Sequence, residues 1–178
     1  MAEAIFSVTP ADGSNAAPGS LRLIQSLANT RGGDQDLLSA REKAAAWLRA
    51  AALLPAESGL SGSEHSALLR LRDSLRDVLA AHAGDREDAD AAARLTRALA
   101  DGRVVLTLDP ASAIGLASAA RASYSNTVAA IAVAIAESAT AGSWLRLKAC
   151  TATGCGLAFY DATEASGSSR CAAHSSCS

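Results

Sequence analysis

The chain has 178 residues, of which 49% are hydrophobic, 19% charged and 3% aromatic, and its formal charge is −2. This hydrophobic content excludes disorder throughout, and the charge gives no overall basic field that would attract nucleic acid. Alanine (44 residues) and leucine (22 residues) dominate the apolar set. Because alanine is the best helix former and β-branched residues are few, the composition favours closely packed helices.

The sequence leads us to expect neither a membrane span nor a secretory signal. The longest apolar run covers residues 128–136, whereas a spanning helix needs about 20 apolar residues. The N-terminus carries Glu3 and Asp12 and lacks the basic stretch followed by an apolar one that marks a secretory signal. We therefore expect a cytoplasmic location, in which cysteines stay reduced.

Residues 1–19 are predicted to form a strand and loop segment, with residues 5–8 as a weak strand, and residues 20–142 a helical domain. Ser20 is placed to cap a first short helix. Ser39 and Glu42 have the spacing of a capping box, in which serine and glutamate satisfy free amides at a helix start. The helix that they open is expected to run until Pro55 stops it.

A second capping box, Ser61 with Glu64, opens a longer helix. Its apolar residues recur at helical spacing on one face, which predicts a core-facing side; they are Leu68, Leu71, Leu75, Val78 and Leu79. A further helix containing Leu95 and Leu99 follows, and Gly102 is well placed to end it.

Residues 103–108 are the best strand candidate, with residues 5–8 as their expected partner. Residues 116–139 then form the most apolar helix, which we expect at the centre of the bundle, with Val128, Ile131 and Ile135 in the core. The predicted fold is mainly α: a helical bundle with a small β element, plus a small C-terminal zinc-finger module over residues 143–178.

All four cysteines fall in the last 29 residues, as the pairs Cys150 and Cys155, then Cys171 and Cys177. Two pairs separated by fifteen residues fit a closed tetrahedral site for one zinc ion. We expect a structural site with four cysteine ligands, and His174 is an alternative fourth ligand. The competing interpretation is a pair of reduced or adventitiously oxidised thiols in a loose tail.

Residues around the cysteines support the metal interpretation. Gly154 and Gly156 flank the second cysteine, where tight turns help the backbone to wrap around a metal. Residues 157–160 form a short predicted strand, which gives this segment its packing. With so few apolar side chains, the metal would supply most of the folding energy of the tail.

No catalytic constellation is found, so we do not expect an enzyme. The motifs HExxH, GxSxG and the P-loop are absent, and His65 and His82 are interpreted as surface residues. In the helical domain, Asn29, Arg41 and Trp47 could line a ligand pocket, because helical bundles host ligands between helices. Alternatively, Trp47 belongs to the core and Asn29 caps the first helix.

The chain as a whole resembles a known family. Residues 23–30 (Leu-Ile-Gln-Ser-Leu-Ala-Asn-Thr) look like the opening motif of the ABATE domain, and the later helices and the strand before Asp109 and Pro110 follow in matching order. Residues 146–161, from Arg146 through Cys150 and Cys155 to Asp161, are similar to the start of a CGNR-type zinc finger. The combination resembles the stress-induced transcription regulators, which implies a helical sensing domain and a DNA-binding finger.

The C-terminal end departs from the family pattern. Gly-Asn-Arg and a basic helix follow the last cysteine in that family, but here Ser178 does, and Arg170 is the only basic residue after Cys150. A DNA-binding module normally clusters Lys and Arg to neutralise phosphates. We therefore expect a truncated or degenerate finger with weakened DNA binding. The rival hypothesis is a protein-interaction or small-ligand-binding module whose finger does not bind DNA.

Overall fold

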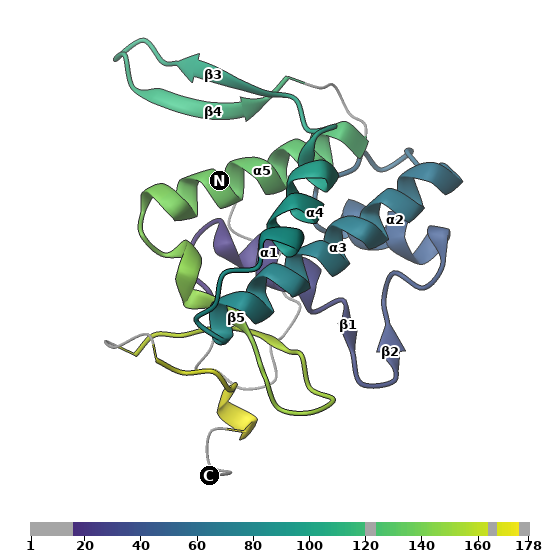
Figure 1. The fold of residues 1–178 in the computed structure, drawn as a ribbon. Coiled ribbons are helices and arrows are strands. Elements are labelled where there is room, and N and C mark those ends of the chain that lie inside the picture. Colours follow the sequence, from purple (N-terminus) through teal and green to yellow (C-terminus); the bar gives the residue numbers. More distant parts are fainter. Residues whose placement is uncertain (1–15, 120–123, 164–166, 175–178) are drawn as a thin grey trace.

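The computed structural model describes residues 16–119, 124–163 and 167–174. In these ranges, helices surrounded by short antiparallel hairpins make up the fold (Figure 1). The helices are α1 (Leu21–Ala28), α2 (Arg41–Ala50), α3 (Gly62–Ala83), α4 (Ala89–Leu99) and α5 (Tyr124–Thr140), with short 3-10 turns η1 (Trp144–Arg146) and η2 (Ala172–His174). The prediction of a mainly α chain with small β elements is confirmed.

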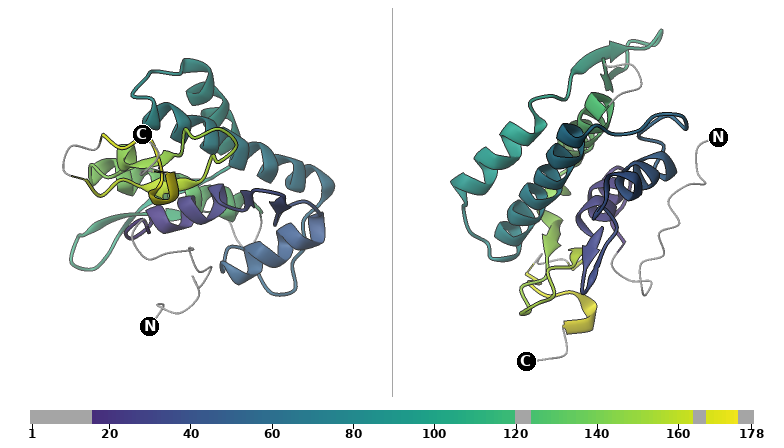
Figure 2. Two further views of the ribbon diagram at one scale, coloured as in Figure 1. Left: turned by 90° about the horizontal axis from the view of Figure 1, so that it is seen from below. Right: turned by 90° about the vertical axis from the view of Figure 1, so that its right-hand side faces the viewer.

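Each hairpin is a separate two-stranded sheet. The paired strands are β1 (Arg31–Gly32) with β2 (Gln35–Asp36), β3 (Val104–Leu108) with β4 (Ile114–Ser118), and β5 (Leu147–Ala149) with β6 (Ala158–Tyr160). The β3–β4 hairpin projects from one end of the helical body, and the β5–β6 hairpin lies at the opposite end, as two further views show (Figure 2).

The two predicted capping boxes have different outcomes. At α3 the prediction is confirmed, because the Glu64 amide donates to Ser61 Oγ at 3.2 Å and the Ser61 amide donates to Glu64 Oε2 at 2.7 Å. At α2 it is wrong: the N-cap is Ala40, and no side chain caps the helix. The fully buried Leu38, whose amide donates to the Asp36 carboxylate at 2.9 Å, anchors the chain just before this start.

Other helix ends also differ in detail from the prediction. Ser20 occupies the N-cap of α1, but its side chain makes no capping hydrogen bond. Helix α2 ends at Ala50, well before Pro55. Helix α4 ends at Leu99, and the Gly102 amide donates to Leu99 O at 3.0 Å. A Cβ on Gly102 would lie 2.9 Å from the Ala129 amide nitrogen, so this glycine lets the chain pass close to α5.

The predicted helix over residues 116–139 is wrong at its beginning. Residues 114–118 form strand β4, and α5 starts at Tyr124. Strand β4 pairs along the whole of β3, from Val104 opposite Ser118 to Leu108 opposite Ile114. The expected partner of β3, residues 5–8, lies outside the described residues. A close hairpin partner decides the conformation of this segment, because strand pairing depends on tertiary context.

The centre of the bundle is helix α3 rather than α5. Helix α3 contacts α1, α2, α4 and β5, whereas α5 contacts α1, α4 and the β3–β4 hairpin. Of the eight predicted core residues, Val78 and Ile135 are partly buried and the other six are fully buried; the six are Leu68, Leu71, Leu75, Leu79, Val128 and Ile131. Within the described ranges, no helix is long and apolar enough to cross a membrane.

Candidate metal centre

The first two cysteines lie around the turn that joins β5 to β6. The hairpin pairs Leu147 with Tyr160 and Ala149 with Ala158, and Cys150 follows β5 directly, with its amide donating to Leu157 O at 2.9 Å. Gly154 and Gly156 have φ values of +78° and +58°, in the left-handed region that glycine adopts at no steric cost. The glycines therefore turn the chain back on itself and place Cys155 beside Cys150.

Two further side chains that could bind a metal, Cys171 and His174, lie at the turn η2. Cys171 immediately precedes this turn and His174 ends it, with the His174 amide donating to Cys171 O at 2.9 Å. Because a 3-10 helix has about three residues per turn, side chains three positions apart point in the same direction. The spacing between Cys171 and His174 thus presents both side chains to the hairpin turn.

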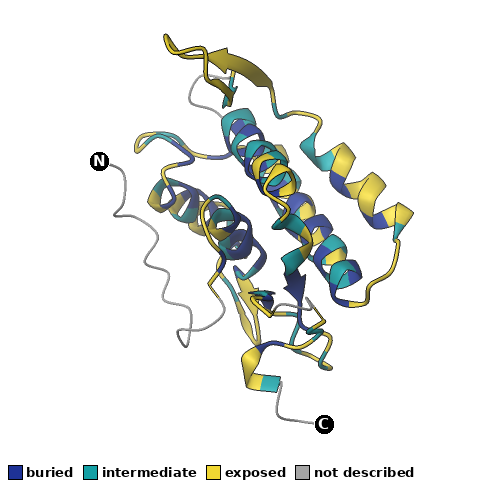
Figure 3. Cartoon of the chain, turned by 90° about the vertical axis from the view of Figure 1, so that its left-hand side faces the viewer, coloured by how far each residue is buried: buried dark blue, intermediate teal, exposed yellow. Residues whose placement is uncertain are grey.

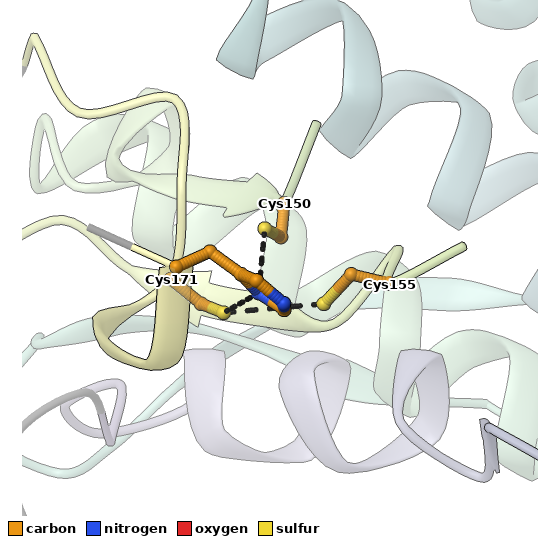
Figure 4. A group of neighbouring side chains, drawn as sticks. Cys150, Cys155 and Cys171 are labelled. Carbon is orange, nitrogen blue, oxygen red and sulfur yellow. Dashed lines mark hydrogen bonds between the residues drawn. The ribbon is translucent and has the colours of Figure 1, made fainter. Parts of the chain in front are cut away.

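The four side chains meet at one point. Their ligand atoms all lie within 4.8 Å of one another, and the three labelled cysteines point toward a common centre (Figure 4). His174 Nδ1 lies 3.2 Å from Cys171 Sγ and 3.7 Å from Cys150 Sγ, and the sulfurs of Cys155 and Cys171 are 3.9 Å apart.

These separations fit a tetrahedral metal ion. With metal–sulfur and metal–nitrogen bonds of about 2.3 and 2.0–2.1 Å, a regular tetrahedron separates its ligands by roughly 3.5–3.8 Å. The site is also sheltered, because Cys150 and Cys171 are buried and pack against Phe159, which is only 2% exposed. The cluster of Cys150, Cys155, Cys171 and His174 could therefore bind one metal ion.

The thiols differ in their affinity for protons. Burial and the neighbouring Cys150 and Cys155 raise the pKa of the Cys171 thiol to about 11. Burial also raises the pKa of Cys150, but backbone hydrogen bonds from Cys171 and Ala152 outweigh it and lower that pKa overall. Three thiolates at this separation need a cation between them at neutral pH, because like charges in a shared site oppose ionisation. A metal ion would supply that charge.

A buried ion pair holds the long loop that carries Cys171 back to the hairpin. Asp161 Oδ2 accepts from Lys148 Nζ at 2.9 Å and from the Ser168 amide at 2.9 Å, and its Oδ1 accepts from the Thr163 hydroxyl at 2.6 Å. The side chains of Lys148 and Asp161 are 6% and 1% exposed. Although burial raises the pKa of Asp161, hydrogen bonds from Thr163, Lys148 and Ser168 lower it to about 2. The ionised carboxylate thus fixes both ends of the loop.

The β5–β6 hairpin, which we call the metal-site hairpin, is joined to the helical body by hydrogen bonds. Asn29, at the C-terminal end of α1, donates to Ala158 O at 2.9 Å and accepts from the Ala158 amide at 2.7 Å. Gln25 donates to the same carbonyl at 3.2 Å. His82 of α3 lies 2.9 Å from Leu147 O. The hydrophobic core is also continuous, since Leu147 is buried within the main cluster.

Helix α3 also reaches the turn that holds Cys155. Arg76 donates to Ala28 O at 2.7 Å and to Arg31 O at 2.9 Å. A Cβ added to Gly156 would lie 2.6 Å from Arg76 Nη2. The Arg76 guanidinium therefore lies against the turn that holds Cys155.

The predicted ligand-binding residues occupy separate places. Asn29 is the C-cap of α1, and its amide binds the Ala158 backbone. Arg41 is exposed and pairs with Glu42 at 3.2 Å. Trp47 packs partly buried against the core and lines a cavity of about 670 Å³; its other lining residues are Asp34, Gln35, Asp36, Leu37, Ser39, Lys43 and Ala46.

Among the predicted metal ligands, the structure brings Cys150, Cys155 and Cys171 together with the alternative ligand His174. Cys177 lies outside the described residues. His82 is not the surface residue that we predicted, because it lies half-buried with its ring edge-on to Trp144 at 5.1 Å. Burial and nearby Lys148 lower the pKa of His82 overall, although the hydrogen bond to Leu147 O raises it. The lowered pKa favours a neutral ring.

Sequence reasoning missed the Lys148–Asp161 pair and the contacts of Gln25, Asn29 and Arg76 with the hairpin. A weak signal for the pair was present, because Lys148 lies two residues before Cys150 in an otherwise apolar strand. Side chains two positions apart share a face in a strand, and a charge on that face implies a partner. The contacts with Gln25 and Asn29 join residues more than 120 positions apart in the sequence, so local patterns hold no trace of them.

Comparison with known families assigns most of the helical body to one family. Residues 21–142 match the profile of ABATE, a family described as a putative stress-induced transcription regulator. The match covers more than half of the chain, and the Cys₃His cluster that follows it is consistent with a CGNR-type finger. No curated protein gives a significant match to the chain.

Proposed function

The chain belongs to the ABATE family, and on this premise we propose that it is a regulatory binding protein whose C-terminal hairpin is held by one structural zinc ion. The observation that carries the proposal is the convergence of Cys150, Cys155, Cys171 and His174 within 4.8 Å. Three sulfurs and one imidazole nitrogen are a ligand set that zinc prefers, whereas magnesium and calcium require oxygen ligands.

We assign this zinc a structural role. Four protein ligands leave no open position for water, and an open position is the mark of a catalytic zinc site. The hairpin is short, and its own apolar cluster is limited to Phe159 and the cysteines with Ala152 beside them. A metal ion that joins the turn of the hairpin to η2 would therefore contribute much of the stability of residues 150–174, which lie beyond the strand that packs on α3.

The proposed regulatory function is sensing by the helical body and readout by the metal-site hairpin. Three helical side chains, Asn29, Gln25 and His82, hydrogen-bond to the backbone of this hairpin. A ligand that shifts α1 or α3 would consequently act directly on the β5–β6 hairpin. In a transcription regulator of this family, that hairpin would transmit the signal to DNA binding.

A second candidate function is a protein-interaction or small-ligand-binding module that does not bind DNA. It is favoured by the charge of the tail, in which Arg170 is the only basic residue after Cys150, against Asp161 and Glu164. The cavity beside Trp47 offers a place for a small ligand, with Asp34, Asp36 and Lys43 as polar groups on its walls.

Metal analysis tests the zinc proposal directly. Elemental analysis of protein purified under reducing conditions should give close to one zinc per chain. Cys155→Ser should lose the metal and make residues 150–174 sensitive to protease, while the helical body keeps its circular dichroism. If His174 is the fourth ligand, His174→Ala loses zinc and Cys177→Ala keeps it; the reverse result would identify Cys177. Metal-free protein with a protease-resistant tail would contradict the proposal.

DNA and ligand binding separate the two candidate functions. Fluorescence anisotropy with mixed-sequence DNA should show an affinity that falls steeply with salt if the chain contacts phosphates. Binding that is absent at low salt would favour the second candidate. A Trp144→Phe variant then leaves Trp47 as the only tryptophan, so that quenching or enhancement of its fluorescence reports ligands that enter the neighbouring cavity.

A further inference from the structure

The β3–β4 hairpin has one face that carries nearly all of its large apolar side chains. Residues paired across an antiparallel sheet point to the same side, and neighbours along a strand alternate. The register pairs Leu106 with Leu116 and Leu108 with Ile114, so that the five large aliphatic side chains of one face form a continuous ladder; they are Val104, Leu106, Leu108, Ile114 and Leu116. We call this set the aliphatic ladder. The opposite face carries Val105, which is 43% exposed, and the smaller residues Thr107, Gly115 and Ala117.

The aliphatic ladder is exposed to solvent. Its members are between 37% and 70% exposed, with Leu108 at 65% and Ile114 at 70%. The hairpin is correspondingly almost entirely in the exposed class in the cartoon coloured by burial (Figure 3). Only the end of β4 is half-buried, at Ala117 and Ser118, on the side where the hairpin meets α5. The rest of the described chain therefore leaves this apolar face open.

Two physical arguments make a free hairpin of this kind unfavourable. A two-stranded hairpin without packing on a face is marginally stable at best in water. In addition, charged side chains usually protect exposed strands from association, but Asp109 is the only charged residue between positions 104 and 118. Its carboxylate is engaged in the turn, where it accepts hydrogen bonds from the amides of Ala111 and Ala113 at 2.8 Å. Nothing on the aliphatic ladder repels an apolar partner.

We propose that the aliphatic ladder is a dimerisation surface that packs face to face against the same surface of a second copy of this chain. The ladder presents on the order of 500 Å² per copy, at the upper end of the largest apolar patches of monomeric proteins. Two copies would bury at most about 1,000 Å² in total, which lies in the range of weak, transient interfaces. An isologous contact matches leucine and isoleucine with themselves, as closed two-fold dimers require.

The projection of the hairpin favours a second copy over a small ligand. Small molecules bind in concave pockets, whereas this hairpin extends away from the helical body (Figures 1 and 2). The dimer would also leave the metal centre free, because the metal centre lies at the opposite end of the molecule. Two metal-site hairpins would then be presented by one dimer, at a fixed separation.

Oligomeric state tests the proposal with the full chain. Sedimentation velocity and light scattering should give twice the chain mass of 17.9 kDa, with the roughly micromolar dissociation constant expected of so small an interface. The double variant Leu106→Lys and Ile114→Lys should raise that constant at least ~100-fold, because the two-fold axis brings like charges together. Its circular dichroism and metal content should match those of the wild type, since both side chains are exposed.

A matched control is provided by Leu145, which is 66% exposed but lies in η1, far from the hairpin along the chain. Leu145→Lys should stay dimeric. A wild-type chain that is monomeric well above micromolar concentration would overturn the proposal, and so would a dimer unaffected by the double variant. A photo-cross-linker at Ile114 adds an independent measurement: cross-links to the hairpin of a second copy support the proposal, whereas cross-links to residues 1–15 of the same chain overturn it.

Discussion

The β3–β4 and β5–β6 hairpins have the same architecture, two antiparallel strands, but opposite surroundings. The β5–β6 hairpin is buried, with Leu147 and Ala158 at most 1% exposed, and side chains of α1 and α3 hydrogen-bond to its backbone. The β3–β4 hairpin has five residues per strand rather than three, yet its large aliphatic side chains are exposed. Length and pairing alone therefore do not decide whether a hairpin is buried.

The comparison shows that each hairpin needs a covering partner, because paired strands without a packed face are marginal. The chain itself supplies this partner for β5–β6, through α3, the Lys148–Asp161 pair and the Cys₃His cluster. For β3–β4 we propose that a second copy supplies it. Substitutions should therefore affect the first hairpin through the stability of the chain and the second through its association.

The largest effect is expected from Asp161→Asn in the covered hairpin. The change leaves the Lys148 ammonium, 6% exposed, without its carboxylate, and breaking a buried ion pair typically costs about 3–5 kcal/mol. Urea denaturation should show this loss. The variant should also bind zinc more weakly, because Asp161 holds the loop that positions Cys171.

Asp77→Asn is the matched control, since Asp77 pairs with Arg94 at 2.9 Å but both side chains are more than 40% exposed. Exposed pairs contribute about 0–1 kcal/mol. A similar cost at Asp77 and Asp161 would show that the buried pair has no special role. Because the pKa of Asp161 is lowered to about 2, its stabilisation is present above the ordinary carboxyl pKa of 3.8 and is lost as the pH falls toward 2.

A paired leucine substitution compares the two hairpins directly. Leu147→Ala removes a fully buried side chain and should lower the free energy of unfolding by about 2–5 kcal/mol. Leu106→Ala removes a side chain that is 59% exposed, so that in the monomer its cost should stay within about 0.5 kcal/mol. Thermal or urea unfolding at low protein concentration measures both, and equal costs would contradict the assignment of one hairpin as covered and the other as open.

The smallest effect is expected from the titration of His82, which links α3 to β5. Burial lowers its pKa below the ordinary value of 6.5, so the unfolded chain takes up a proton before the folded one as the pH falls. Stability should therefore be constant above about pH 6.5 and decline below it, until the pH reaches the lowered pKa of the folded state. The decline should be shallower in His82→Gln, as melting temperatures across pH 5–8 would show; the same slope in both proteins would exclude this role.

Much of the helical body could be predicted from the sequence. The capping box of Ser61 and Glu64 marks the start of α3 correctly, and Leu71 and Leu75 on its apolar face are fully buried. Three of the four predicted cysteines converge, and His174, the alternative ligand, lies with them. These features depend on residues that are close in the sequence or on a repeat of 3.6 residues, so local patterns contain the information.

Other features depend on which distant segments meet. The alanine-rich segment before α5 has the composition of a helix, yet residues 114–118 become a strand because β3 lies beside them. The C-cap Asn29 became the anchor of Ala158, a residue 129 positions away.

The sequence by itself therefore determined the helical class, the core face of α3 and the thiol chemistry of the candidate metal site, because helix periodicity, capping and thiol content are local properties. The tertiary structure alone decided which hairpin is covered. Burial of Lys148 with Asp161, and exposure of the aliphatic ladder on β3–β4, both follow from where α3 and α5 lie relative to each hairpin. Burial is a property of the surrounding elements, and no single segment encodes it.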